Sequence, residues 1–127
     1  MRNNIEMRKL TVVIILGFTS HIFGQCFQTI SAGNQYSCAI KNDNTLWIWG
    51  SNNDGSLGNG TYNTSSNVPI QIITDCLSIS LGYEHTLAIK QDKTLWVWGR
   101  NNYGQLGDGT NISKNIPTQI GTDINWR

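Results

Sequence analysis

The chain has 127 residues, a formal net charge of +1 and only 13% charged residues, which is enough sequence for one small domain. This near-neutral balance excludes a strongly basic nucleic-acid-binding surface and an acidic tail. Thirteen glycines, many asparagines and five tryptophans, against two prolines, favour strands joined by tight turns. The composition therefore predicts an all-β protein.

The first 24 residues have the layout of a secretory signal. Arg2, Arg8 and Lys9 precede an apolar run over residues 10–18, which is shorter than the roughly 20 residues that span a bilayer. A basic start, a short apolar core and then small and polar residues are typical of a signal peptide. We predict a signal peptide over residues 1–24, and hence a secreted, cell-surface or periplasmic protein. A buried core strand is the alternative interpretation of the apolar run.

Removal of the signal would leave six basic and seven acidic residues in positions 25–127, a net charge of −1. A surface that neutralises phosphates needs clustered Lys and Arg, which this stretch lacks. We therefore expect no nucleic-acid partner and no membrane span in the mature chain.

The rest of the chain consists of two copies of one sequence repeat. A shift of 49 places residues 30–61 on residues 79–110, and 19 of these 32 positions are identical. One residue is then lost, so that Pro69 aligns with Pro117. We assign residues 25–77 to a first repeat and residues 78–127 to a second, with the first residues of a possible third.

Each repeat predicts four short strands, which in the first copy lie near residues 29–31, 37–41, 45–49 and 68–72. The third strand is apolar on both faces, as Leu46-Trp47-Ile48-Trp49 and again over residues 95–98. A strand of this kind is covered on both faces, and short antiparallel sheets that are each covered by their neighbours are typical of propeller blades. We expect the Trp pair of one blade to pack on the Leu/Ile or Leu/Val face of the other.

The motifs His85-Thr86-x-Ala88, Thr94-Leu95-Trp96-x-Trp98-Gly99 and the Asn-Tyr-Gly-Gln-Leu-Gly-Asp-Gly-Thr run over residues 102–110 resemble the repeat of the regulator of chromosome condensation family. The resemblance implies a seven-bladed β-propeller. This chain would be two four-stranded antiparallel blades of such a propeller, an incomplete part of it, so further blades or self-association are expected. The first copy departs from the pattern at Tyr36, Asp54 and Asn59.

The resemblance implies two contrasting functions. The eukaryotic namesake of the family exchanges nucleotides on a small nuclear GTPase, whereas secreted bacterial relatives include a β-lactamase inhibitor, which is a binder. Because the predicted export places this chain away from a nucleus, we predict a protein–protein interaction module without catalysis of its own. A guanine-nucleotide exchange factor and a carbohydrate-binding propeller are the alternatives, and the identity of the protein partner stays open.

Positions that differ between otherwise matching copies are where a repeated scaffold usually places partner contacts. Such differences occur at Ser51/Arg100 and Asp54/Tyr103, in the loop that follows the third strand. The predicted interaction residues are Ser51, Asn52, Asn53, Asp54, Arg100, Asn101, Asn102 and Tyr103.

No catalytic, cofactor-binding or metal-binding residue is predicted. His85 could act as a general base, but no nucleophile motif accompanies it, so we expect a structural histidine that bonds the neighbouring loop. Asp43 and Asp92 recur in hairpin turns, where Asp bonds local backbone. The run Asn52-Asn53-Asp54-Gly55 resembles part of a calcium loop without its terminal Glu, and the glycines that follow lack the GK[ST] of a phosphate loop.

The tryptophans and cysteines leave two further questions. Trp47 and Trp49 share a face and could stack on a sugar, although interblade core is the better account of a strand that is apolar on both faces. Cys38 aligns with Leu87 and reads as a small core residue. Cys26 and Cys76 could form a disulfide across the blades, but the sequence does not determine their separation.

Overall fold

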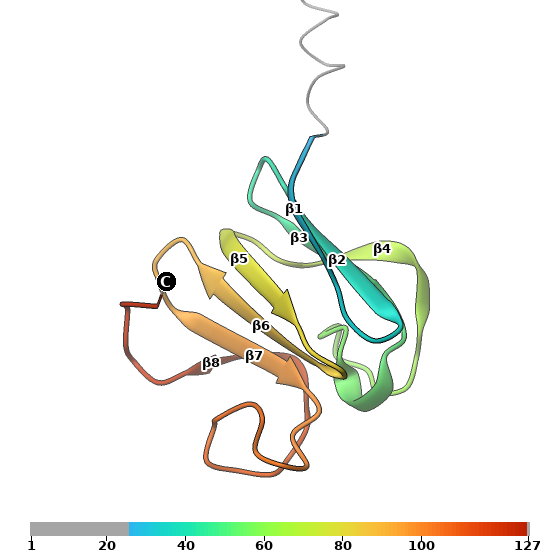
Figure 1. The fold of residues 1–127 in the computed structure, drawn as a ribbon, viewed down its shortest axis with the longest axis vertical. Coiled ribbons are helices and arrows are strands. Elements are labelled where there is room, and N and C mark those ends of the chain that lie inside the picture. Colours follow the sequence, from blue (N-terminus) through green and yellow to red (C-terminus); the bar gives the residue numbers. More distant parts are fainter. Residues whose placement is uncertain (1–25, 127) are drawn as a thin grey trace, which may run out of the picture.

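The computed structural model describes residues 26–126, so the signal peptide predicted over residues 1–24 lies outside the described part. The described chain is all-β, as predicted, and forms eight strands and one 3₁₀ turn (Figure 1). The first repeat contributes β1 (Phe27–Ala32), β2 (Tyr36–Lys41), β3 (Leu46–Gly50), η1 (Asn53–Gly55) and β4 (Ser66–Ile73). The second contributes β5 (Cys76–Leu81), β6 (His85–Lys90), β7 (Leu95–Gly99) and β8 (Lys114–Ile120).

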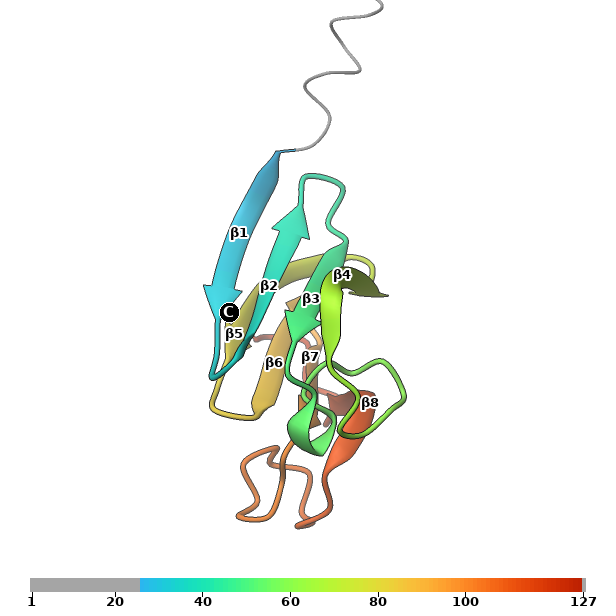
Figure 2. The ribbon, with the colours of Figure 1, turned by 90° about the vertical axis from the view of Figure 1, so that its right-hand side faces the viewer.

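The strands form two antiparallel four-stranded sheets, in the orders β1-β2-β3-β4 and β5-β6-β7-β8. These are the two predicted blades, which lie side by side in Figure 1, whereas Figure 2 looks onto the first blade with the second behind it. The register repeats with the sequence, since Cys38 pairs with Ile48 in the first blade and Leu87 pairs with Val97 in the second. Pro69 lies on the edge strand β4, where its missing N–H removes no bond from the interior of the sheet.

The main core lies between the blades. Trp98 is fully buried and Trp96 partly buried, and both pack with the aliphatic face of the first blade, which includes Ile40, Leu46 and Ile48 at 0% exposure. This confirms the expected contact of one blade's Trp pair with the Leu/Ile face of the other. Burial of a single large apolar side chain contributes about 1.5–3 kcal/mol, so this interface is the main source of stability between the blades.

The hairpin turns are built as predicted. Asp43 accepts bonds from the backbone N–H and the hydroxyl of Thr45, at 3.0 and 2.6 Å, and Asp92 does the same with Thr94. These bonds lower the pKa of both carboxyl groups, because they stabilise the ionised form. Asn44 and Lys93 occupy the left-handed position of each turn, with φ of 63° and 68°.

The thiols of Cys38 and Cys76 lie in the interblade core, at 1% and 0% exposure. Burial raises the pKa of Cys38 to about 11 and that of Cys76 to about 12. Cys38 is thus the small core residue that was expected. Cys76 carries a free thiol, so the bridge to Cys26 that the sequence left open is not formed in the structure.

Each blade also has an outer face that the other blade does not cover. On the first blade this face carries Ile30, at 76% exposure, and the partly exposed Trp47 and Trp49. The ammonium of Lys41 lies 3.8 Å from the ring centre of Trp47 and covers part of that ring. Over residues 26–126, no helix is long and apolar enough to cross a membrane.

Candidate functional site

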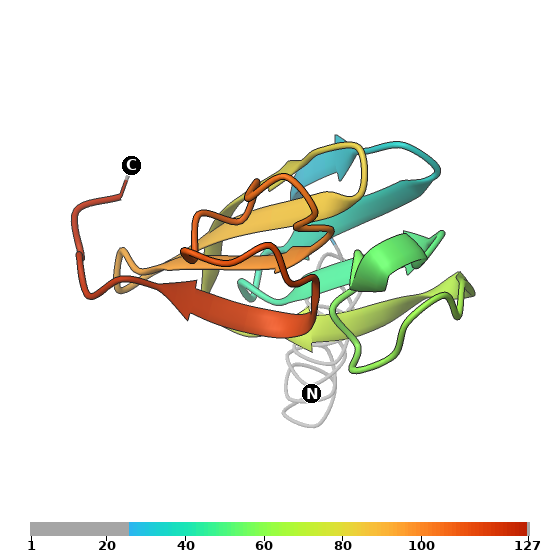
Figure 3. The same cartoon turned by 90° about the horizontal axis from the view of Figure 1, so that it is seen from below.

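The Gly-rich loops that follow β3 and β7 lie at the same end of the two blades, at the bottom of Figure 1. Figure 3 looks onto this end, with the loop of the first blade in green and that of the second in orange. The predicted interaction residues all belong to these two loops, so the fold brings the two halves of the prediction together.

One asparagine in each loop is a buried structural residue. Asn52 is 0% exposed, accepts the backbone N–H of Leu57 at 2.9 Å and donates to the carbonyl oxygen of Thr61 at 3.1 Å. Asn101, also 0% exposed, makes the matching bonds to Leu106 and Thr110. Asn52 and Asn101 therefore hold their loops closed from inside, and neither side chain reaches the surface where a partner would contact it.

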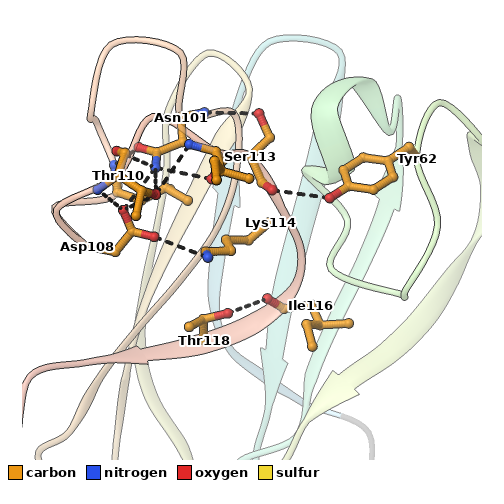
Figure 4. A network of polar contacts seen from close by, with 10 residues as sticks. Tyr62, Asn101, Asp108, Thr110, Ser113, Lys114, Ile116 and Thr118 are labelled. Atoms are coloured by element: carbon orange, nitrogen blue, oxygen red, sulfur yellow. Dashed lines mark hydrogen bonds and ion pairs between the residues drawn. The ribbon is translucent and has the colours of Figure 1, made fainter.

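The second loop extends this scaffold through Asp108 (Figure 4). The carboxylate of Asp108 accepts the backbone N–H and hydroxyl of Thr110, at 2.9 and 2.8 Å, and lies 3.3 Å from the ammonium of Lys114. The bonds from Thr110, above all, lower the pKa of Asp108 to about 2. Asn59 takes the same place in the first loop and accepts the same pair of bonds from Thr61. Asn and Asp are thus interchangeable here, because both offer an acceptor oxygen at the same point.

Exposed and partly exposed residues of the two loops meet Glu84, from the turn between β5 and β6, in a cluster centred on Arg100. Its guanidinium lies 2.6 Å from the carboxylate of Glu84 and 3.7 Å from that of Asp54. Asn53 donates to the other oxygen of Glu84 at 3.1 Å. We call Asn53, Asp54, Glu84, Arg100 and Tyr103 the loop cluster. It joins the two blades at their surface through charged and amide groups.

Arg100 and Tyr103 determine the charge and the exposed aromatic surface of the loop cluster. The Tyr103 ring is 85% exposed, and the guanidinium of Arg100 lies 5.8 Å from its centre. The hydrogen bond to Glu84 raises the pKa of Arg100, so this side chain stays charged at any physiological pH. With Asp54 and Glu84 both acidic, the loop cluster has a net charge of −1 around a central cation and an exposed aromatic ring. Such a surface suits a partner that offers both charge and an apolar contact.

Glu84 was not among the residues predicted from sequence. It lies in the turn between β5 and β6, where the first copy has Gln35. The two copies differ in charge at this position, so the criterion that selected Asp54/Tyr103 would have selected it as well. The predicted residues came only from the loop after the third strand. The β5–β6 turn lies at the same end of the blade, and its difference between the copies was not considered. Ser51 is partly exposed and Asn102 exposed, and neither contacts Arg100 in the loop cluster.

The environment of His85 differs from expectation. Its ring lies directly over Gly82, where an added Cβ would come within 2.6 Å of both ring nitrogens, and within residues 26–126 its side chain makes no hydrogen bond. The prediction that it bonds the neighbouring loop is therefore wrong for this chain. The equivalent Tyr36 does make such a bond, from its hydroxyl to the carbonyl oxygen of His85 at 2.6 Å. The reason is positional, because Tyr36 faces the second blade whereas His85 faces outward. Burial lowers the pKa of His85.

The described residues offer little for metal chemistry, since no three His, Cys, Asp or Glu side chains gather there in a group that could hold an ion. In the run that resembles a calcium loop, the carboxylate of Asp54 pairs with Arg100. The side-chain oxygen of Asn52 accepts the backbone N–H of Leu57 in its own loop.

The family follows from two matches to repeat models. Both are described as the regulator of chromosome condensation (RCC1) repeat, one matching residues 27–56 and 76–105 and the other residues 43–89 and 92–125. The chain belongs to the RCC1 repeat family. No curated protein sequence matches this RCC1-repeat chain.

Solved structures share the fold. Human WBSCR16 superposes with a TM-score of 0.68 at 24% identity, over 78% of this chain and 26% of its own. Prp20p from Saccharomyces cerevisiae, in a study of its binding to Gsp1p and histones, gives 0.72 at 18% identity, over 81% and 27%. Yeast RCC1 (Prp20) bound to Kap60 gives 0.70 at 20%, over 80% and 26%. The RCC1-repeat chain thus spans about a quarter of each of these structures and has the blade fold of part of an RCC1 propeller.

Proposed function

We propose that this RCC1-repeat chain is a secreted or cell-surface protein-interaction module without catalysis of its own, and that the loop cluster is its contact site. The observation that carries the proposal is the joining of two blades at one surface by Arg100, beside the exposed Tyr103. Arginine and tyrosine are enriched at the energetic centres of protein interfaces.

The structure of the loops supports this assignment. The buried asparagines Asn52 and Asn101 and the repeated glycines build the same frame in both loops, while the exposed residues differ between them. A rigid frame lowers the entropy lost when its exposed side chains bind a partner. Yeast Prp20, whose fold is similar, binds Gsp1p, histones and Kap60, so a fold of this kind can serve protein partners. Export is supported by the charged and then apolar start of the sequence.

Contact at the loop cluster can be tested by photo-crosslinking. A benzophenone amino acid replaces Tyr103 in one variant and Asn42, on the hairpin at the opposite end of the first blade, in a matched control. Each is expressed in the source cells, and crosslinked products from the envelope and medium are identified by mass spectrometry. We expect a discrete protein adduct from position 103 and none from position 42. Equal labelling from both positions, or none from position 103, would reject the loop cluster as the contact site.

Export is tested separately on the same preparation. N-terminal sequencing of the product outside the cytoplasm is expected to begin near Gln25. Recovery of chains in the cytoplasm that retain the predicted signal peptide would contradict the proposed location. The contact site is judged by the crosslinks alone.

A further inference from the structure

We propose that the two outer faces of this chain bind each other, so that copies associate head to tail through the same interface that joins the two blades within one chain. The partner is a second copy of this chain. This inference concerns the blade faces and does not depend on whether the loop cluster binds a partner.

In the intrachain interface the second blade presents a donor side, formed by the side chains of Trp98 and Thr86, to an acceptor side of the first blade, the carbonyl oxygen of Ser56. Other bonds across the same interface run in the opposite sense. The indole N–H of Trp98 and the hydroxyl of Thr86 both donate to the carbonyl oxygen of Ser56, each at 3.0 Å. Asn115 and Gly60 exchange two bonds, of 2.9 and 2.8 Å. These polar contacts surround the apolar core of the interface and determine its register.

The outer face of the first blade repeats the donor side. Trp49 stands where the second blade has Trp98, Ser37 where it has Thr86, and Asn67 where it has Asn115. Ser37 pairs with Trp49 across β2 and β3, as Thr86 pairs with Trp98, so these side chains share one face. Ile30 on the same face is 76% exposed, whereas its equivalent Ile79 packs on the interblade core.

The outer face of the second blade repeats the acceptor side. Leu87, Ile89, Leu95 and Val97 take the places of Cys38, Ile40, Leu46 and Ile48, and the first three line a shallow pocket of about 310 Å³. The carbonyl oxygen of Gln105 corresponds to that of Ser56, and Gly109 corresponds to Gly60.

The side chains of His85 and Asn102 gain hydrogen-bond partners in this arrangement. Tyr36 bonds the carbonyl oxygen of His85 within the chain, so the His85 ring would bond the carbonyl oxygen of Tyr36 in the next copy. Asn53 bonds Glu84 within the chain, so Asn102 would bond Gln35 in the next copy. The cross-blade hydrogen bonds named here thus each have a matched donor and acceptor on the two outer faces, which a pair of unrelated apolar surfaces would not show. The ion pair of Arg100 with Asp54 has no such match, because Ser51 and Tyr103 take these places.

The second blade's outer face is also continuous with the path of the chain. Trp126 borders the pocket, beside Ser78 and Ile79. By the repeat, residues 124–126 correspond to residues 76–78, at the start of β5. Trp126 thus lies beside the outer face of the second blade.

A head-to-tail interface generates either a closed ring or an open filament. Propellers close with about four to eight blades, and units of two blades close only at even numbers. The closures nearest to the seven blades that the family resemblance implies have six or eight blades. We therefore expect rings of three or four copies.

The test blocks each outer face separately. Ile30→Glu places a carboxylate on the outer face of the first blade, and Ser80→Glu does so on the second; both positions are exposed within one chain, so folding should be retained. Asn42→Glu adds the same charge at a hairpin tip, away from both faces. The chain is expressed from Met1, its subunit mass is measured by mass spectrometry, and assembly is followed by sedimentation over a concentration series.

We expect the unsubstituted chain and Asn42→Glu to assemble alike, and each blocked variant alone to stay a monomer. An equimolar mixture of the two blocked variants retains one intact pair of faces, so it should form a 1:1 dimer and nothing larger. A thermal transition in each variant establishes that it is folded. The proposal is overturned if the unsubstituted chain is monomeric throughout, if either blocked variant assembles alone, or if the mixture shows no dimer.

Discussion

Trp98 in the second blade donates its indole N–H to the carbonyl oxygen of Ser56 in the first, at 3.0 Å, although 42 residues separate them in the chain. The same oxygen accepts the hydroxyl of Thr86, and the Trp98 ring lies against Gly58, where an added Cβ would come within 2.8 Å of it. One carbonyl group of the first blade thus accepts from two side chains of the second.

Trp98→Phe should lower the free energy of unfolding by about 1–3 kcal/mol, because the smaller phenyl ring loses the hydrogen bond to Ser56 and leaves part of the buried indole volume empty. Trp98→Ala should lower it by roughly 3–5 kcal/mol, because a cavity opens in the interblade core. Urea unfolding followed by circular dichroism measures both, with Trp126→Phe as the control at a more exposed site. A Trp98→Ala variant as stable as the parent would show that the blades are not held by this contact.

Asn101→Ala should destabilise the chain by about 2–4 kcal/mol, because the N–H of Leu106 and the carbonyl oxygen of Thr110 lose their buried partner. The adjacent Asn102→Ala, at an exposed position, should change stability by less than about 0.5 kcal/mol. Thermal and urea unfolding of the pair makes the comparison. Equal effects from the two substitutions would contradict the structural role of Asn101.

Arg100→Ser, which introduces the residue of the first copy, should cost less than about 1 kcal/mol of stability, since the ion pairs are partly exposed. The same substitution should abolish the crosslink from position 103, because Arg100 organises the loop cluster. Unfolding and crosslinking are measured on the same sample. Loss of stability with the crosslink intact would assign Arg100 a structural role only.

Stability should depend on pH through His85. Burial lowers its pKa in the folded state, so the unfolded chain binds the proton more readily. The free energy of unfolding should therefore be greatest above pH 6.5 and fall as the pH drops below that value. Asp43, Asp92 and Asp108 have lowered pKa values and lose their stabilising bonds only in stronger acid, so they do not contribute between pH 5 and 7.5.

The control for this effect is His85→Tyr, which introduces the residue found at the same position of the first blade. Urea unfolding at pH 5 and pH 7.5 should show a difference for the parent chain and little difference for the variant. A pH dependence retained in His85→Tyr would assign the effect to other groups.

The chain should not accelerate nucleotide release from a small GTPase. In a fluorescent-nucleotide release assay, a stoichiometric excess of chain should leave the rate unchanged. A rate that rises in proportion to added chain would favour the exchange-factor alternative over a binding module.

The sequence by itself determined the elements that depend on local or repeated patterns. The strand positions follow from apolar runs and turn residues, and the hairpin role of Asp43 and Asp92 follows from their place in tight turns. A third strand that is apolar on both faces predicts an interblade role for its tryptophans. The structure confirms this for Trp96 and Trp98, whereas Trp47 and Trp49 lie on the outer face of the first blade. The repeat of 49 residues then predicts two blades of the same design.

Only the tertiary structure decided which residues of the loops face solvent. Asn52 and Asn53 are neighbours in a motif that both copies share, yet one is buried and the other reaches Glu84 across the blade boundary. Glu84 and Asp54 contact Arg100 because two turns from different blades converge at one end. The local sequence around each residue does not predict this contact. Tyr36 and His85 occupy equivalent positions but have different partners, since one faces a blade and the other an outer surface. Contacts between segments distant in the chain depend on how the sheets pack, which is why the contacts of these residues were decided by the fold.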